Sequence, residues 1–497
     1  MITFSDFSCE YEYLGSGNKR ELSINKSRNY KVYINDKEIP VYTCRMSKFP
    51  MNQEWRGYQR PIEQSEIHSF VNIIGNETIS VKVKIENEKD RVRVKPYSKN
   101  IILEKKGDYV FFTIKENGYY VLENGDCHDS LLIMYSSFVP IEGKPTYYFG
   151  KGVHFAGKIV LKSNESLYLD KDAYVYGSVF AENASDLKIY GNGIIDDGTE
   201  ERVCANAYEK FTNGNLKFYD CNNIIIKGVG IANSAIWCVN LFHCFSVIMD
   251  ELKVFGQWRY NTDGIDIVNS QYISIKNSLI QSFDDSITLK GIERYKDTDC
   301  AHIRVDNCVL QCDWGKTLEV GLETRCKEMY DISFNNCDIL RAGNTACDIQ
   351  NGDYAFIHDV IFNDVRIEIE KEYTMHVYQQ SFEEKYPEKA EFFSICLLKI
   401  FNRQFNNERI VAHNLNDFDD NAATVDNIVA KNITVFFDED IPKVDDKYNC
   451  WIDISSHVRG KRYKKVVVEN VVINGSVVSG DDIKMSVADT DEFVWEK

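Results

Sequence analysis

One short pattern of apolar residues recurs eight times along the chain. With h for an apolar residue it reads hxhxxhxh, as in IIIKGVGI and VIFNDVRI, and the first six copies begin 23, 26, 30, 29 and 28 residues apart. The eight copies begin at Ile224, Val247, Ile273, Ile303, Ile332, Val360, Ile428 and Val466. The alternation within a copy predicts strand, and the two-residue offset in its middle predicts a bend. Each copy has one apolar face that only its neighbours can cover, so the repeats are expected to stack into a solenoid.

The spacing of the copies selects one kind of solenoid. At about 3.3 Å per strand residue, one repeat supplies roughly one turn of a three-sided coil with its loops. The rival fold, an antiparallel sandwich, needs hairpin turns such as Asn-Gly between strands, and these are sparse. We therefore predict a right-handed parallel β-helix over 143–497, with its first coils over 146–198. The rhythm breaks at an insertion of about 370–427, within which FSICLLKIF is predicted to be a strand.

The first 142 residues lack the repeat. They carry alternating strand-like runs, YKVYI, ISVKVKI, YVFFTI and SLLIMY, separated by Gly, Asn and Asp. This predicts an N-terminal antiparallel β-sandwich domain over 1–142 that docks against the first coils. The expected fold class is therefore all-β.

Charge and cysteine content argue against several kinds of partner. The 76 acidic residues outnumber the 58 basic ones, and the net charge of -18 repels phosphate backbones and anionic lipid heads. We therefore expect no nucleic acid and no membrane partner, and no apolar run is long enough to span a bilayer. The amino terminus shows no secretory signal, which predicts a cytoplasmic protein. Fifteen cysteines without a CxxC pair argue against a disulfide framework or a zinc site, so no metal is predicted.

A second series of strands precedes four of the repeat copies and carries a polar stripe. The segments are DGIDIVN, DDSITLKG, KTLEVGLE and TACDIQNG. Equivalent positions of neighbouring coils lie about 4.8 Å apart, so their outward-facing residues should line up. The aligned residues are Asp266, Thr288, Glu319 and Asp348, with Lys290 and Gln350 two residues further along.

Three carboxylates come just before these strands. Asp263, within Asn261-Thr262-Asp263, and the Asp284-Asp285 pair are 21 residues apart, close to one coil, so they should share one patch. Like charges so close raise the pKa of at least one member, which then stays protonated near neutrality. One protonated and one ionised carboxyl are what inverting glycoside hydrolysis requires, an acid for the leaving oxygen and a base for water. A solvated acidic turn or a calcium loop is the alternative interpretation.

Aromatic residues gather at the same end of the strands. Trp258 and Tyr260 come just before Asn261, and Trp314 comes just before the strand that begins at Lys316. Taken singly, each is more often a packing residue. Their clustering beside the carboxylates predicts a platform on which sugar rings can stack.

The two carboxylate motifs resemble those of glycoside hydrolase family 28, the polygalacturonase family. NTDG followed one coil later by DDSITLK carries the resemblance, GNGIIDDG resembles a turn of the family's β-helix, and the likeness covers 146–352. The resemblance implies inverting hydrolysis without a cofactor, with Asp284 as the general acid. Asp263 and Asp285 would hold and activate the water, Asn261 would orient the site, and Lys290 would touch substrate.

Two positions depart from the family pattern. The family's Gly-His-Gly strand corresponds to Gly315-Lys316-Thr317, and its Arg-x-Lys clamp for a galacturonate carboxylate falls near Asp348. An acid where a cation is expected, with Glu319 and Glu323 nearby, disfavours a uronate. We therefore predict a neutral or differently charged glycan rather than plain galacturonan. Glu319, Asp348 and Asp266 are expected either to bind sugar hydroxyls or to solvate the outer face.

The expected partner is an oligosaccharide or polysaccharide, cleaved from a chain end if imported oligosaccharides are the substrates. Three alternatives stay open. The chain is also similar to dextranase-like α-glucan hydrolases, which place a sandwich domain before a β-helix with clustered aspartates. A polysaccharide lyase would recruit Lys290 and Lys316, and a non-catalytic glycan-binding β-helix would need none of the three aspartates. The oligomeric state, with a homodimer as one option, is not fixed by the sequence.

Overall fold

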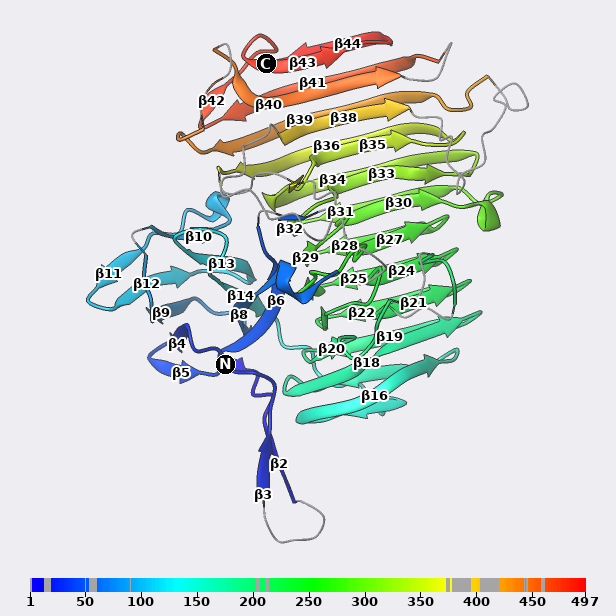
Figure 1. Ribbon diagram of the computed structural model, residues 1–497. Coiled ribbons are helices and arrows are strands. Elements are labelled where there is room, and N and C mark those ends of the chain that lie inside the picture. The colour runs from blue at the N-terminus through cyan, green and yellow to red at the C-terminus, as the bar shows by residue number, and fades with distance from the viewer. Residues whose placement is uncertain are drawn as a thin grey trace.

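In the computed structural model the described residues are 2–12, 19–49, 51–52, 60–89, 91–202, 206–210, 214–371, 376–377, 395–402, 420–441, 443, 446–456 and 461–497. They form an N-terminal domain of two β-sheets that lies against the flank of a long parallel β-helix (Figure 1). The fold is all-β, as predicted. The helices among the described residues are the short 3-10 turns η1 (Ile62–Gln64), η2 (Tyr97–Lys99) and η3 (Glu293–Tyr295). No helix within the described ranges is long and apolar enough to cross a membrane.

Each full coil of the right-handed β-helix contributes strands to three parallel sheets, which we name the first, second and third faces. The first face consists of β15 (Tyr147–Phe149), β17 (Ser166–Leu169), β19 (Ser185–Gly191), β22 (Asn222–Lys227), β25 (Phe245–Asp250), β28 (Gln271–Lys276), β31 (Cys300–Asp306), β34 (Glu328–Arg341), β36 (Phe356–Ile369), β39 (Val425–Phe437), β41 (Tyr463–Ile473) and β44 (Thr490–Glu496). The second face consists of β16 (Gly152–Leu161), β18 (Ala173–Glu182), β20 (Ile194–Asp196), β23 (Gly230–Ala232), β26 (Lys253–Phe255), β29 (Leu279–Ser282) and β32 (Val309–Cys312), and the long strand β34 bends into it. The third face continues from the end of β18 into β21 (Leu216–Tyr219), β24 (Val239–Phe242), β27 (Ile265–Val268), β30 (Ile287–Gly291), β33 (Lys316–Thr324), β35 (Thr345–Asn351), β38 (Ile395–Asn402), β40 (Tyr448–Ser456) and β43 (Ile483–Val487). The short strand β42 (Ser476–Val477) pairs with β41 in the antiparallel sense.

The eight predicted repeat copies stack in register along the first face. Ile224 pairs with Val247, Val247 with Ile273, and the ladder continues through the first residue of every later copy to Val466. The apolar residues of the copies enter one continuous core, with Ser278 taking the third apolar position in its copy. Burial of these residues at about 25 cal/mol per Å² stabilises the rod, since no single coil can cover its own face.

The predicted bend in each copy is a residue in the left-handed backbone conformation. The bend residues are Gly228, Glu251, Asn277, Asn307, Asn336, Asp364, Asn432 and Asn470. Asn and Asp dominate this set because their short side chains tolerate a positive φ. Neighbouring bends also bond to each other, as where Asn307 Nδ2 donates to Asn277 Oδ1 at 2.8 Å.

Two sheets form the N-terminal domain, in the orders β1-β8-β14-β13-β10, with β6 beside β8, and β11-β12-β9-β4-β5. Their strands are β1 (Thr3–Phe4), β4 (Tyr30–Ile34), β5 (Lys37–Ile39), β6 (Tyr42–Ser47), β8 (Ser65–Ile74), β9 (Ile79–Ile85), β10 (Val92–Lys95), β11 (Glu104–Lys106), β12 (Tyr109–Ile114), β13 (Gly118–Asn124) and β14 (Ser130–Ser136). The described pairings in these sheets are antiparallel except that of β8 with β14, which is parallel. Two small pairs, β2 (Cys9–Glu12) with β3 (Lys19–Leu22) and β7 (Met51–Asn52) with β37 (His376–Val377), lie outside them.

The N-terminal domain covers the second face of the β-helix. Phe70 and Met134 from its six-stranded sheet pack in one buried cluster with Phe255, Leu279 and Val309, which point outwards from the second face. The domain therefore sits beside the loops that lead from the second face to the third, where the predicted carboxylates lie.

Most of the predicted insertion at about 370–427 lies outside the described residues. Within it, the predicted FSICLLKIF strand is present as β38, which extends the third face. The fourteen described cysteines are all free, and thirteen of them are buried, as expected for small apolar side chains.

Candidate active site

The three predicted catalytic carboxylates lie on the loops from the second face to the third face. Ile265 of β27 pairs with Ile287 of β30, and the Gly264 amide donates to the Asp285 carbonyl at 2.8 Å. Asp263 and Asp285 each stand two residues before these paired positions, so they are equivalent residues of adjacent coils. With Asp284 next in sequence, the structure brings all three carboxyl groups to one place.

A glycine of the next coil allows two of the carboxylates to converge. A Cβ atom at Gly315 would lie 2.5 Å from Asp285 Oδ1 and 2.6 Å from Asp284 Oδ1, so no side chain fits there. Since both oxygens lie so close to a single point, they are separated by no more than about twice that distance. The glycine thus leaves the two acids exposed to each other and to the space in front of them.

Lys290 supplies the positive charge beside Asp263 in the cluster of three carboxyl groups. Its Nζ lies 2.9 Å from Asp263 Oδ2, 2.9 Å from Asp266 Oδ1 and 3.8 Å from the centre of the Trp237 ring. Asn261 Nδ2 donates to the other Asp263 oxygen at 3.2 Å. Asp263 is therefore held from two sides, and Lys290 is engaged by protein carboxylates.

Lys316 supplies the positive charge beside Asp285. By the resemblance described above, it stands at the position where the family carries histidine. Its backbone amide donates to Asp285 Oδ1 at 3.0 Å. Its Nζ lies 3.5 Å from the same oxygen and 3.4 Å from Glu319 Oε1. Asp285 therefore has a fixed donor and a nearby positive charge, and both favour its ionised form.

The surroundings displace the pKa values of the neighbouring acids in opposite directions. Burial, followed by the charges of Asp285 and Asp263, raises the pKa of Asp284 well above its usual value. Burial also raises the pKa of Asp285, but Lys316 and Lys290 more than offset it and lower that pKa to about 2. Burial raises the pKa of Asp263 to about 6 against the opposing effect of Lys290. The surroundings thus favour the protonated form of Asp284 and the ionised form of its neighbour Asp285.

The carboxylates form part of the wall of a cavity of about 920 Å³. Tyr260 and Trp314 line it on the side of the N-terminal domain, and their rings lie 5.6 Å apart. Tyr208 and Trp237 line it elsewhere, 5.3 Å apart and edge to face. A volume of this size with aromatic walls and a few convergent polar groups is typical of a small-molecule site.

A strap formed by residues 206–210 crosses the third face beside this cavity. Tyr208 lies before β21, and its hydroxyl donates to Glu323 Oε1 of β33 at 2.7 Å. These strands are four steps apart in the sheet, about 19 Å at the usual strand spacing. The Tyr208 side chain therefore bridges from the β21 side of the cavity to β33.

Two buried groups hold the strap through its backbone. Lys217 Nζ donates to the carbonyls of Ala207 at 2.9 Å and Glu209 at 2.7 Å. The Tyr219 hydroxyl donates to the Tyr208 carbonyl at 2.7 Å. Three successive carbonyls are thus fixed from the third face.

Trp258 does not line the cavity, in contrast to the expected role. Its side chain is 7% exposed and packs between Arg45 and Arg259, whose guanidinium carbons lie 5.8 and 5.7 Å from the ring centre. The chain turns only after this residue, at 260–261, so the Trp258 ring lies against Arg45 of the N-terminal domain while Tyr260 lines the cavity.

The predicted polar stripe exists, but it reaches neither solvent nor the cavity wall. Asp266 pairs in register with Thr288, Thr288 with Glu319, and Glu319 with Asp348. All four side chains are fully buried. Lys290 lies against Asp266, Lys316 against Glu319, and Gln350 donates to Asp348 at 2.8 Å.

Because these acids are buried, the expectation that they contact sugar hydroxyls or solvate the outer face is wrong for the structure as described. Burial raises the pKa of Asp266 and Glu319 well above their usual values and that of Asp348 to about 6. Asp266 and Glu319 lie behind Lys290 and Lys316 and are second partners of these cations.

Several residues that line the cavity were not predicted from the sequence. They are Tyr208, Trp237, Arg294 and Arg325, whereas Glu323, which was expected near the pocket, does line it. Trp237 stands two residues before its third-face strand, much as Trp314 does, so the same argument could have found it. Tyr208 belongs to a loop without periodicity, and no sequence signal places it over the third face. Within the described residues, no group of three or more His, Cys, Asp or Glu side chains is arranged to hold a metal ion.

Curated relatives match part of the chain. An exopolygalacturonase of Oenothera organensis is 28% identical over 170 residues, which are 32% of this chain and 44% of the relative. A polygalacturonase of Malus domestica is 28% identical over 152 residues, 29% of this chain and 32% of the relative. The chain thus spans less than half the length of these relatives.

A solved structure and a family model cover more of the chain. Dex49A from Penicillium minioluteum has a TM-score of 0.56 at 12% identity, over 95% of this chain and 89% of that one, and so shares the fold of both domains. The model of glycosyl hydrolases family 28 matches residues 144–404, which is more than half of the chain and includes all three carboxylates. On this match the chain belongs to glycosyl hydrolases family 28.

Proposed function

We propose that this chain is a glycoside hydrolase that inverts the sugar at the bond it cleaves and works from a chain end. In this proposal Asp284 protonates the leaving oxygen, while Asp285 and Asp263 hold and activate one water molecule. The observation that carries it is the opposed protonation of adjacent acids, with the pKa of Asp284 raised well above normal and that of Asp285 lowered to about 2. An acid and a base are thus both available near neutral pH.

The short separation of Asp284 and Asp285 favours a second candidate, the retaining mechanism. Retaining glycosidases place their two carboxyls about 5–5.5 Å apart, and inverting ones about 6.5–9.5 Å apart. The Asp284 and Asp285 oxygens, which converge on Gly315, can lie no further apart than about twice the 2.5–2.6 Å that separates each from that point, which is below the inverting range. The inverting proposal therefore depends on Asp263, whose carboxylate lies on the adjacent coil.

The strap supports action at a chain end. A polymer that runs through the active site needs a groove open at both ends, whereas the Tyr208 to Glu323 hydrogen bond crosses the cleft. Substrate would then enter the cavity by one terminus, with its last sugar between the aromatic walls.

The charges around the cavity support a substrate other than plain galacturonan. Of the cations that line it, Lys290, Lys316 and Arg325 each face a protein carboxylate within 3.5 Å. Arg294 is exposed and lies 5.3 Å from the Tyr295 ring centre. Cations already neutralised by the protein gain little from a uronate carboxylate, which favours a neutral or differently charged glycan.

The experiment is a screen of the purified protein against a panel of oligosaccharides and polymers, with detection of new reducing ends. The panel includes galacturonan, α-glucans and neutral galactose-containing chains, and Asp284→Asn serves as the matched control. Release of single sugars or short units from a neutral chain, absent in the control, supports the proposal. Faster cleavage of galacturonan would overturn the substrate assignment, and an unsaturated product would indicate a lyase instead.

A further inference from the structure

Arg60 of the N-terminal domain touches both segments that carry the catalytic carboxylates, although it lies outside the residues matched by the family model. Its side chain is 2% exposed. Nη1 donates to the Trp258 carbonyl at 2.7 Å and to Ser47 Oγ at 2.9 Å, and Nε donates to Gln64 Oε1 at 3.1 Å. The guanidinium carbon lies 4.5 Å from the centre of the Phe283 ring.

The two β-helix contacts of Arg60 are close in sequence to the catalytic residues. Trp258 opens the segment that ends in Asp263, and Phe283 directly precedes Asp284. One planar cation therefore spans two loops of adjacent coils, binding the first by a hydrogen bond and the second through the face of an aromatic ring. Holding a guanidinium out of water is costly unless its donors are used, so the contacts of Arg60 fix its position tightly.

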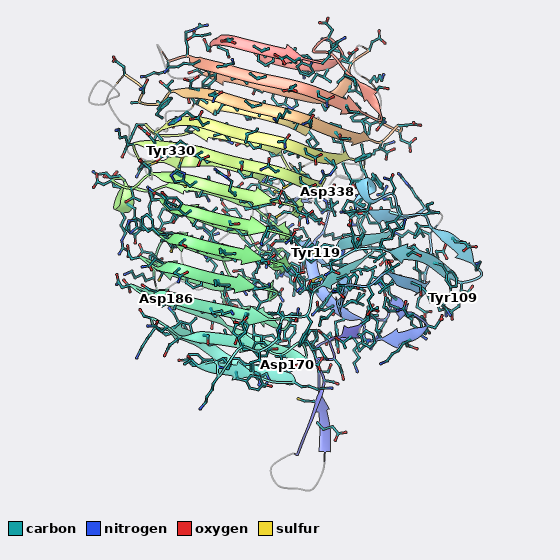
Figure 2. All side chains as sticks on the ribbon, turned by 180° about the vertical axis from the view of Figure 1, so that it is seen from behind. Tyr109, Tyr119, Asp170, Asp186, Tyr330 and Asp338 are labelled. Carbon is teal, nitrogen blue, oxygen red and sulfur yellow. The ribbon has the colours of Figure 1, made fainter. Side chains whose placement is uncertain are left out.

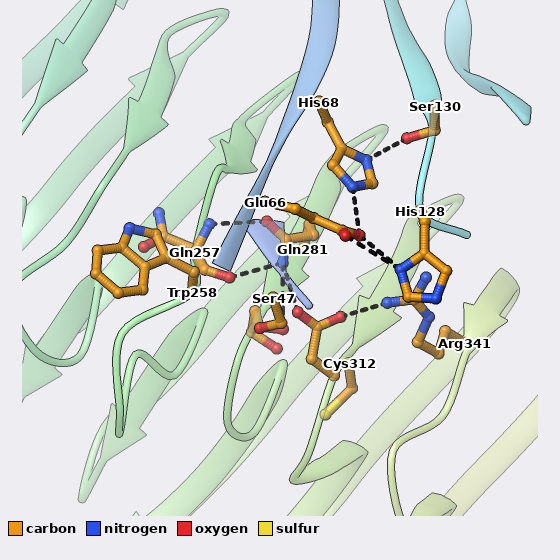
Figure 3. Close-up of polar contacts among 12 residues, drawn as sticks. Ser47, Glu66, His68, His128, Ser130, Gln257, Trp258, Gln281, Cys312 and Arg341 are labelled. Carbon is orange, nitrogen blue, oxygen red and sulfur yellow. Dashed lines mark hydrogen bonds and ion pairs between the residues drawn. The ribbon is translucent and has the colours of Figure 1, made fainter. Parts of the chain in front are cut away.

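A buried polar network of β-helix residues, on the side that faces the N-terminal domain, anchors the same loops (Figure 3). Gln281 Oε1 accepts from the Gln257 amide at 2.9 Å, and Gln281 Nε2 donates to the Gln257 carbonyl at 3.0 Å. Asp313 accepts from Arg341 Nη1 at 2.8 Å. Gln257 and Asp313 directly precede Trp258 and Trp314, and Gln281 stands three residues before Asp284. These contacts fix each loop where it leaves the second face. The network does not reach the outer part of either loop.

We propose that Arg60 is a positioning residue of the active site, which holds the outer parts of the 258–263 and 283–285 segments so that the three carboxyl groups converge. It does not line the cavity and acts through Trp258 and Phe283. Its effect on turnover rests on the proposed function, whereas its effect on the two loops does not.

A merely structural alternative is that Arg60 only docks the N-terminal domain. Tyr119 offers a matched control, because it sits in the same domain interface (Figure 2) and its hydroxyl donates to the Asn277 carbonyl at 3.1 Å. Asn277 is a bend residue between the first and second faces, away from the catalytic loops. Tyr119→Phe therefore removes one hydrogen bond across the interface without touching either loop.

The first measurement is amide hydrogen exchange on the full-length protein, which requires no substrate. In Arg60→Ala, peptides covering 257–263 and 282–286 are expected to exchange faster than in the unaltered protein, while Tyr119→Phe leaves them unchanged. Equal protection of these peptides in Arg60→Ala and the unaltered protein would overturn the proposal, whatever the substrate screen shows. If Arg60→Ala does not fold, Arg60→Lys replaces it, since a single ammonium cannot reach both loops and the same exchange is expected.

The second measurement separates positioning from docking by kinetics on the substrate that the screen identifies. Arg60→Ala is expected to lower kcat by about 10- to 100-fold with KM changed by less than about threefold, because misplaced groups mainly cost the transition state. Tyr119→Phe is expected to keep kcat within about twofold of the unaltered protein. Equal losses of kcat in the two variants, or none in Arg60→Ala, would overturn the positioning role. No turnover by the unaltered protein would instead count against the proposed function, and the exchange result would still decide the loop contact.

Discussion

Asp284 and Asp285 are neighbours in sequence, approach the same point above Gly315, and nevertheless have pKa values displaced in opposite directions. The asymmetry arises because Lys316 bonds Asp285 by its backbone amide and faces it with its ammonium group. Asp284 is left beside the resulting negative charge. A one-residue step along the chain thus separates a candidate acid from a candidate base.

Replacement of Asp284 by asparagine should remove the acid and leave the fold intact. Loss of a general acid lowers turnover by about 100- to 10,000-fold on a substrate whose leaving oxygen needs a proton. Because the pKa of Asp284 is raised in the folded state, its charged form is disfavoured there, so the neutral Asn costs no stability near pH 7. The melting temperature should be no lower than that of the unaltered protein, and a turnover close to that of the unaltered protein would remove Asp284 from the acid role.

The pH–rate profile should be bell-shaped. As the pH falls through about 6, Asp263 takes up a proton and no longer helps to activate the water. As the pH rises through the raised pKa of Asp284, the acid loses its proton. Because the neighbouring carboxyl groups influence each other's titration, the two limbs of the profile report on the coupled group and not on single residues. The profile of kcat/KM from acid to alkaline pH checks this, and a rate that rises steadily to alkaline pH would contradict a protonated acid.

Lys290 should stabilise both the fold and the ionised state of Asp263. Lys290→Met leaves Asp263 and Asp266 buried without their cation, so the free energy of unfolding near pH 7 should fall by about 3 kcal/mol or more. The acid limb of the pH profile should move to higher pH, because Lys290 holds the pKa of Asp263 down. Lys276→Met is the control, since its exposed ammonium lies 3.8 Å from Asp250 and should contribute less than about 1 kcal/mol. Equal denaturant midpoints for the two variants would contradict this account.

Tyr208 should determine where along a chain the enzyme cuts. Tyr208→Ala removes the ring and the Glu323 hydrogen bond that cross the cleft, so longer internal fragments should appear among early products. Tyr208→Phe keeps the ring and should change the product pattern less. Tyr272→Ala, at an exposed position of the first face, serves as the control. Chromatography of products at low conversion distinguishes the outcomes, and an unchanged ladder of products in Tyr208→Ala would contradict closure by the strap.

The repeat predicts the β-helix well because the same alternation that forms a strand also determines its neighbours. Val247 must lie beside Ile224 and Ile273 once the coils stack, and Asp263 must then lie one coil from Asp285. The co-location of the carboxylates could therefore be derived from spacing alone.

Other features depend on contacts that no local pattern encodes. Alternation shows that Glu319 points outwards but not that Lys316 will cover it, and so its burial was missed. The strap that carries Tyr208 has no periodicity. The parallel pairing of β8 with β14 joins two strands of one sheet that are separated along the chain by strands of both sheets.

The most direct test of the central claim is a titration of the aspartate side chains by NMR in protein labelled with carbon-13 at the aspartate carboxyls. The signal that disappears in Asp284→Asn should remain that of a protonated carboxyl at about pH 7, since the pKa of Asp284 is raised well above normal. The signal that disappears in Asp285→Asn should remain ionised down to about pH 3, above its pKa of about 2. Two signals that titrate together near the ordinary aspartate value, or that titrate in the reverse order, would contradict the division of acid and base between these neighbours.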